Sequence, residues 1–147
     1  MTETTANPWE ESLIADIRAN GGRPTRGPLA GHPLLVMYTT GAKSGQRRRQ
    51  ILTYSRDGDA YVVAGSASGA PSDPAWIGNV RANPKVEIEL GDKIYDATAE
   101  VVDENERERL WAAHVAALPW FGDYEQQAGR KIPVVRITTT GAPRPVG

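Results

Sequence analysis

The chain has 147 residues, of which 39% are hydrophobic and 24% charged, and this is enough for one folded domain with its own core. It contains no cysteine, which excludes disulfides, thiolate-bound zinc, iron–sulfur clusters and a cysteine nucleophile. The net charge of −1 conceals an asymmetry, because residues 18–56 hold eight basic residues and no acidic one.

The N-terminal segment is predicted to be a tail followed by a short helix. Residues 1–7 are polar, and we expect them to be flexible. Over residues 8–20, Trp9, Leu13 and Ile17 recur at helical spacing, and two glycines follow.

Three strands are predicted next. Residues 34–40 form a nearly continuous apolar run, which is typical of a strand covered on both faces. A second strand is expected over about 48–54 and a third over 60–66. Asp57-Gly58 between them is a strong hairpin signal.

The middle of the chain predicts a helix and two further strands. Asp73 is placed to cap a helix that has Pro74 at its first position and ends before Asn83-Pro84. Residues 85–90 and 93–102 alternate between apolar and polar side chains and are separated by a glycine turn, so we expect two strands.

The C-terminal part predicts a longer helix and a last strand. Asp103 and Glu106 resemble a capping box that opens a helix reaching about Leu118. A further helical turn is expected at 121–127 and a strand at 132–138. The glycine- and proline-containing tail over 141–147 is expected to be loose.

These elements predict one domain over residues 1–147 that is mainly β, with peripheral helices. About six strands, mostly joined by hairpins, indicate an antiparallel, barrel-like sheet. A doubly wound parallel sheet is disfavoured, because no G-x-G-x-x-G motif follows a strand. No apolar run approaches the roughly 18 residues of a membrane span. We expect a cytoplasmic protein without an integral span; peripheral membrane association and oligomeric state, including a homodimer, stay open.

A basic turn is the first candidate site. Lys43, Arg47, Arg48 and Arg49 surround a turn flanked by glycines, where backbone amides and guanidinium groups can bind an anion such as a phosphate. A solvated hairpin tip is the alternative. The small-residue loop at 65–69 precedes a helix and is a second possible ligand contact, or simply a loop.

Aromatic side chains and histidines give weaker signals. Trp120, Phe121 and Tyr124 follow the long helix and form either core packing or a lid over a flat ligand. His114 lies on the apolar stripe of that helix, which favours a packed residue over a catalytic base. With His32 as the other of only two histidines, no metal site is expected.

Ordered motifs give the chain a resemblance to the deazaflavin-dependent nitroreductase family, whose members bind coenzyme F420. The resemblance covers roughly residues 30–137. Its motifs are Thr39-Thr40-Gly41-Ala42-Lys43-Ser44-Gly45-Gln46, Arg56-Asp57-Gly58, Val62-Val63-Ala64-Gly65-Ser66, Asp73-Pro74-Ala75-Trp76, Asn79, Ala82-Asn83-Pro84-Lys85-Val86, Pro119, Asp123-Tyr124 and Ile132-Pro133-Val134-Val135.

The resemblance implies a split β-barrel of the flavin-reductase type and hydride transfer from reduced F420 to a small, flat acceptor. Catalytic roles would fall to Ser66 and Tyr124, which can donate to developing charge or deliver a proton. The cofactor-binding residues implied are Ala42, Lys43, Ser44, Arg48, Ala64, Gly65, Ser66, Ala67, Ala75, Trp76, Ile77, Gly78 and Asn79. The substrate-binding residues implied are Leu118, Trp120, Phe121 and Tyr124. No metal is implied.

Departures from the family pattern bear on the acceptor. Leu118 and Phe121 stand where a nitroimidazole-activating member has tyrosines, so we expect quinones or activated enones to be reduced faster than nitroimidazoles. Ala42 stands where arginine is frequent, and Arg47 and Arg49 are expected to restore the lost charge.

Three functions are compared at this point. The first is an F420-dependent reductase, the second an FMN-type split-barrel oxidoreductase, and the third a non-enzymatic cofactor carrier or nucleic-acid-binding module. The arginines lack interleaved aromatic residues, which disfavours nucleic acid. A small-molecule acceptor is therefore the expected partner.

Overall fold

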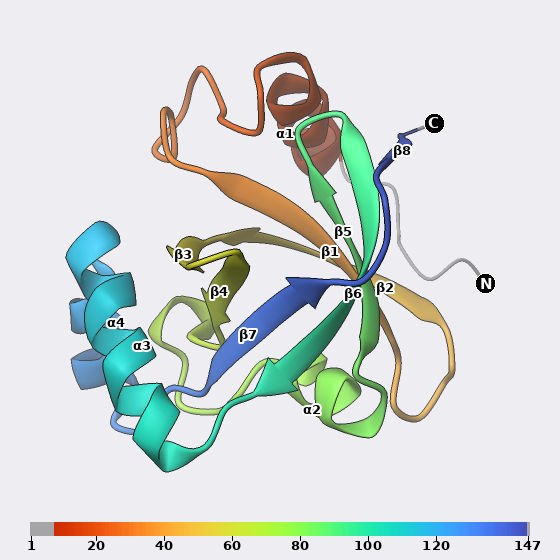
Figure 1. Cartoon of the computed structure of the whole chain (residues 1–147). Coiled ribbons are helices and arrows are strands. Elements are labelled where there is room, and N and C mark those ends of the chain that lie inside the picture. Colours follow the sequence, from red (N-terminus) through yellow and green to blue (C-terminus); the bar gives the residue numbers. More distant parts are fainter. Residues whose placement is uncertain (1–7, 147) are drawn as a thin grey trace.

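The computed structural model describes residues 8–146 and shows one curled antiparallel sheet with helices packed around it (Figure 1). The expected tail 1–7, and Gly147 of the expected tail 141–147, lie outside the described residues. The helices are α1 Pro8–Ala19, η1 Ala67–Gly69 (a 3-10 turn), α2 Ala75–Ala82, α3 Glu104–Ala117 and α4 Phe121–Ala128. The strands are β1 Leu34–Thr40, β2 Arg47–Thr53, β3 Ser55–Asp57, β4 Ala60–Ala64, β5 Lys85–Leu90, β6 Lys93–Val101, β7 Val134–Thr139 and β8 Arg144–Pro145.

The sheet is a split barrel. Its strand order is β2-β1-β5-β6-β7-β4-β3, and the pairings along this path are antiparallel. The two edge strands, β2 and β3, are separated in the chain by Tyr54 alone. Because one residue spans only a few ångströms, the sheet must curl until these edges meet at one end. The predicted antiparallel split barrel is confirmed.

Strand β1 is apolar on both faces because each face meets a different core. Leu35 and Met37 face the barrel interior, where they join the apolar cluster that includes Ile77 of helix α2. Leu34 and Val36 face the other way and pack with helix α1. The continuous apolar run in the sequence is therefore explained by cover on both sides.

Helix α3 begins as its sequence predicts. The side chain of Asp103 accepts a hydrogen bond from the backbone nitrogen of Glu106 at 3.0 Å and so caps the helix. The Glu106 carboxylate does not complete a capping box. It binds Arg109 and Arg136 instead.

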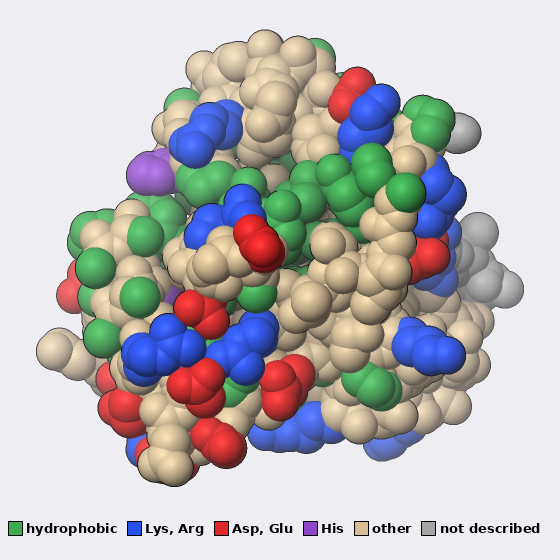
Figure 2. Space-filling view, in the orientation of Figure 1, with side chains coloured by type: hydrophobic (Ala, Val, Ile, Leu, Met, Phe, Trp, Pro, Cys, Tyr) green, Lys and Arg blue, Asp and Glu red, His purple; other side chains and the backbone are tan. Residues whose placement is uncertain are grey.

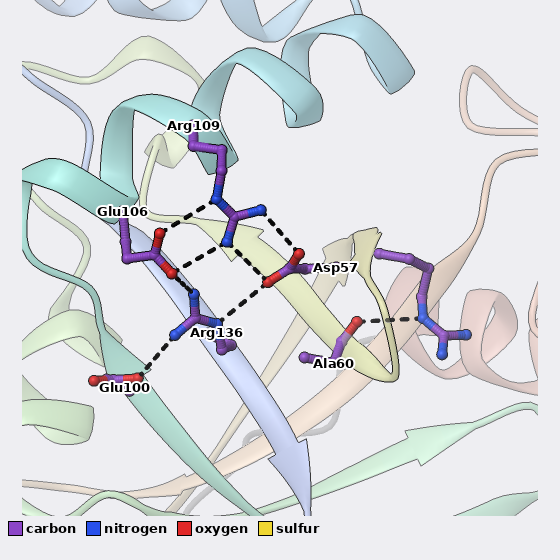
Figure 3. Close-up of polar contacts among 7 residues, drawn as sticks. Asp57, Ala60, Glu100, Glu106, Arg109 and Arg136 are labelled. Atoms are coloured by element: carbon purple, nitrogen blue, oxygen red, sulfur yellow. Dashed lines mark hydrogen bonds and ion pairs between the residues drawn. The ribbon is translucent and has the colours of Figure 1, made fainter.

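An ion-pair network fastens α3 to strands β3 and β7 (Figure 3). Arg109 of α3 and Arg136 of β7 both bind Asp57 of β3 and Glu106 of α3. Hydrogen bonding from Arg109 is the main cause of a lowered pKa at Asp57. Figure 2 shows the same face with charges of both signs gathered over α3, as expected of a solvated surface.

Two features of the fold correct the sequence expectations. Asp73 does not cap α2: the N-cap is Pro74, no side chain caps it, and Asp73 binds Arg130. The tail expected to be loose contains strand β8, where Arg144 and Pro145 pair with β6. Two ion pairs hold Arg144, to Glu87 and to Asp96. Within residues 8–146, no helix is long and apolar enough to cross a membrane.

Candidate functional site

The basic turn between β1 and β2 has a tight backbone that requires glycine. Gly41 donates to the Gln46 carbonyl at 2.7 Å and accepts from the Gly45 nitrogen at 2.9 Å. A Cβ on Gly41 would lie 2.5 Å from the Ser44 hydroxyl oxygen, and Gly45 has a φ of +69°. The Ser44 hydroxyl also lies 3.4 Å from an Arg48 guanidinium nitrogen, so the turn gathers these two side chains at one place.

Helix α2 is joined to this turn through Asn79. Its amide oxygen accepts a hydrogen bond from the Ala42 nitrogen at 3.0 Å, and its amide nitrogen lies 3.3 Å from the Thr39 hydroxyl. Asn79 is buried, with 8% of its surface exposed. The basic turn and α2 are therefore held together as two walls of one groove.

That groove has a volume of ≈ 580 Å³ and is lined by most of the residues predicted to bind a cofactor. Ile77 is not among them, because it is buried in the barrel core. The predicted residues that line the groove are Ala42, Lys43, Ser44, Arg48, Ala75, Trp76, Gly78 and Asn79.

A second cavity, of ≈ 290 Å³, adjoins the first at Trp76, which lines both. Its walls include seven predicted residues and five, mostly apolar, that were not predicted to line a site. The predicted residues are Ala64, Ser66, Ala67, Trp76, Trp120, Phe121 and Tyr124, and the added ones are Leu29, Leu34, Ile51, Leu52 and Thr53. The sequence signal for Leu34, Ile51 and Leu52 was the apolar character of β1 and β2, and nothing in the sequence indicated Leu29 or Thr53.

Two predicted residues support this cavity without lining it. Gly65 donates to the Pro133 carbonyl at 2.9 Å, and a Cβ there would lie 2.8 Å from Ile77, so only glycine fits. Leu118 is 2% exposed and packs in the apolar cluster beneath α3 and α4.

The aromatic wall of the second cavity is centred on Phe121. Its ring centroid lies 5.7 Å from that of Trp120 and 5.2 Å from that of Tyr124. The edge of the cluster is closed by His32, whose ring packs against Trp120 at 4.8 Å. The wall is therefore a contiguous aromatic surface, suited to a flat ligand.

Behind Phe121 lies the buried His114, whose ring centroid is 4.5 Å away. Its Nδ1 is 2.7 Å from the Ser55 hydroxyl oxygen, and the side chain is fully buried. Burial lowers the pKa of His114 to about 4, which keeps the ring neutral near pH 7. His114 lines neither cavity, so the predicted packed residue is confirmed.

Residues 18–56, which include no acidic residue, do not form one anion-binding surface, because several of their arginines bind distant carboxylates. Arg47 pairs with Glu87 at 2.9 Å, so its charge is engaged on the outer sheet. Arg49 pairs with Glu10 and Glu11 of α1, at 3.0 Å each. Arg47 does not line the groove, so the structure does not support the expected replacement of the lost charge by Arg47. Arg49 does line the groove, and its expected contribution of charge there stays a prediction.

Comparison with known proteins decides the family. Residues 11–139 match the family model described as F420H(2)-dependent quinone reductase. The chain belongs to this family. The predicted family and enzyme class are thereby confirmed, and the family description names reduced coenzyme F420 as the predicted cofactor.

Individual relatives agree with this assignment. An F420H(2)-dependent quinone reductase of Mycobacterium tuberculosis is 39% identical over 124 residues, covering 82% of this chain and 83% of the relative. A solved F420-H2 dependent reductase, FDR-A, has a TM-score of 0.65 and 37% identity, over 72% of this chain and 94% of the other. A structure described as a domain-swapped dimer has a TM-score of 0.67 and 33% identity, over 90% of this chain and all of the other.

The two joined cavities fit such a cofactor. Lys43, Ser44 and Arg48 supply donors for phosphate and carboxylate oxygens in the larger groove. The smaller cavity offers aromatic and small side chains to a flat ring. The described residues contain no group of three or more His, Asp or Glu side chains suited to a metal ion.

Proposed function

We propose that this protein transfers a hydride from reduced coenzyme F420 to a quinone, with activated enones as further acceptors. The observation that carries the proposal is the junction of the two cavities at Trp76. A cofactor with an anionic chain and a flat ring needs a cationic groove beside a space with aromatic walls, and the two cavities that share Trp76 support this reading.

Binding is assigned to the basic turn and to the loop after β4. Lys43 and Arg48 attract the phosphate and the carboxylates, and the Ser44 hydroxyl donates a hydrogen bond to them. Ala64, Ser66, Ala67 and Trp76 would hold the ring in the smaller cavity, and Ala75 and Asn79 would contact the part of the cofactor that lies in the larger groove.

The reduced deazaflavin supplies the hydride when it is bound, so the chain has to orient the reactants rather than provide a strong base. Trp120, Phe121 and Tyr124 hold the acceptor flat against the ring face. The hydroxyl groups of Ser66 and Tyr124 donate hydrogen bonds to the negative charge that develops on the acceptor oxygen. These same aromatic side chains exclude water from the cavity.

An acceptor panel tests this proposal. Loss of reduced F420 is followed by absorbance with a quinone, an activated enone and a bicyclic nitroimidazole. We expect the quinone to react fastest, because Phe121, which lines the cavity, lacks the hydroxyl that orients a nitro group. One missing hydrogen bond to developing charge can cost about 10²–10³ in rate. Phe121→Tyr should raise nitroimidazole turnover more than quinone turnover.

Cofactor titration separates the alternatives. Quenching of tryptophan fluorescence by oxidised F420, FMN and a short RNA compares the three expected functions directly, since Trp76 and Trp120 line the cavities. Tighter binding of FMN than of F420 would overturn the cofactor assignment. We include a cytoplasmic location in the proposal. A homodimer is a further expectation, motivated by the similar structure described as a domain-swapped dimer, and light scattering tests it.

A further inference from the structure

Arg130 makes several hydrogen bonds to the loop of residues 65–73, which borders the smaller cavity. No motif in the sequence indicated this role. It lies two residues beyond the end of α4, with 16% of its side chain exposed. Its guanidinium binds the Asp73 carboxylate at 2.6 Å. It also donates to four backbone carbonyls of the loop at 3.0–3.3 Å, those of Gly65, Ser66, Ala70 and Ser72.

The segment held in this way is the loop 65–73, which joins β4 to α2 and has only the short turn η1 as regular structure. Such a loop has few internal hydrogen bonds of its own, and one planar guanidinium satisfies carbonyls at both of its ends. Ala67 in this loop has a φ of +47°, a left-handed conformation that costs energy for alanine. Outside contacts must therefore hold the loop in this shape.

The loop and helix α4 are neighbouring walls of the smaller cavity. Ser66 and Ala67 line it from the loop, and Phe121 and Tyr124 line it from α4. Gly69 touches α4 directly, because a Cβ there would lie 2.8 Å from the Gln127 side chain. Arg130 follows α4 in the chain and binds the loop from that side, so it fastens the loop to the C-terminal end of α4.

We propose that Arg130 is a positioning residue that holds loop 65–73 against α4 and so keeps the ring cavity open to a fixed width. It lines neither cavity and touches neither cofactor nor acceptor in this role. Asp73 is its anionic partner, which explains why this residue is drawn away from the helix start that its sequence position favours. The inference rests on the proposed function, in which this cavity receives the deazaflavin ring.

The test compares Arg130→Ala and Arg130→Lys with the wild type in two measurements. We expect the dissociation constant for F420 to rise at least about tenfold in Arg130→Ala, as for the loss of several charge-assisted hydrogen bonds. Arg130→Lys keeps the charge, but one ammonium group cannot bind all of these carbonyls at once. This variant should therefore also bind F420 more weakly than the wild type. Hydrogen exchange should accelerate in peptides covering 65–73 in both variants.

Chemical rescue and a matched control make the role specific. Millimolar guanidinium should restore part of the F420 affinity of Arg130→Ala and leave the wild type unchanged. Arg109→Ala removes another guanidinium that binds two carboxylates, Asp57 of β3 and Glu106 of α3, and lines neither cavity, so it should change neither affinity nor exchange in 65–73. Normal affinity or unchanged exchange in folded Arg130→Lys would overturn the inference. Failure of the wild type to bind F420 would instead overturn the proposed function, while the exchange measurement would still decide whether Arg130 holds the loop.

Discussion

The amide oxygen of Asn79 accepts a hydrogen bond from the backbone nitrogen of Ala42 at 3.0 Å, which joins helix α2 to the basic turn across 37 positions of sequence. The amide nitrogen of the same side chain lies 3.3 Å from the Thr39 hydroxyl. One buried side chain thus fixes the turn relative to the helix that forms the opposite wall of the groove.

We predict that Asn79→Ala weakens F420 binding and lowers stability. The substitution removes the hydrogen bonds of the buried Asn79 amide to the Ala42 nitrogen and the Thr39 hydroxyl, and a hydrogen bond contributes about 0.5–1.5 kcal/mol to stability. Asn83→Ala is the matched control, because Asn83 accepts from the Lys85 nitrogen at the exposed end of the same helix. Urea unfolding and F420 titration of both variants measure the difference. Equal F420 affinity in both would remove Asn79 from the site.

Lys43 and Arg48 should each contribute to binding of the anionic part of F420. We expect Lys43→Ala and Arg48→Ala to weaken binding by about 1–3 kcal/mol and to keep the fold, because the turn is at the surface. Arg47→Ala is the control from the same turn, since Arg47 pairs with Glu87 and lies over the Tyr38 ring. Titrations at low and high salt should show an affinity that falls with salt in the wild type and less steeply in the two variants. A loss in Arg47→Ala as large as in Arg48→Ala would contradict this division.

Trp76 should matter for both stability and binding. It is 6% exposed and packs in the barrel core with Ile77 and Val80, yet it lines both cavities. We expect Trp76→Ala to lower the free energy of unfolding by about 3–5 kcal/mol and to weaken F420 binding. Trp76→Phe should lose less stability and less F420 affinity than Trp76→Ala, because an aromatic ring still fills the space. Unfolding curves with and without F420 separate the two effects; a stable Trp76→Ala protein would contradict the packing.

His114 should make stability depend on pH. Its pKa is about 4 in the folded protein against an ordinary value of 6.5, so between these values the unfolded chain binds a proton that the folded chain does not. Stability from this group is therefore complete above about pH 6.5 and is lost as the pH falls towards 4, by up to about 3 kcal/mol. Unfolding of wild type and His114→Gln between pH 4.5 and 7.5 measures it. Between pH 6.5 and 4.5 the free energy of unfolding should fall more steeply with decreasing pH in the wild type than in His114→Gln, and equal slopes would contradict the buried neutral ring.

Short-range patterns in the sequence predicted local structure well. The cap of Asp103 on α3 and the turn at Asp57-Gly58 depend on residues a few positions apart, and both are as expected. The cap of Asp73 on α2 was wrong because Arg130, 57 positions away, binds the carboxylate instead. Strand β8 was not expected, since Arg144 and Pro145 have no strand pattern of their own and pair with β6 through tertiary contacts.

In the candidate site, too, features that are local in the chain could be predicted and long-range contacts could not. The residues expected to bind an anion are a cluster within one turn, and the aromatic wall is a cluster after one helix, so each is local in the chain and could be predicted. The pairing of Arg47 with Glu87 and of Arg49 with Glu10 was not predicted, since these partners lie about 40 positions away.

The sequence by itself determined the antiparallel strands, the family and the residue types of the site, because hairpins, caps and ordered motifs are encoded in neighbouring positions. Only the tertiary structure decided which basic side chains line the groove and that Trp76 lines both cavities. It also decided that Arg130 binds the loop of residues 65–73. The physical reason is that the closing of a curled sheet brings together side chains dozens of positions apart, and their partners are set by distance in space rather than by order in the chain.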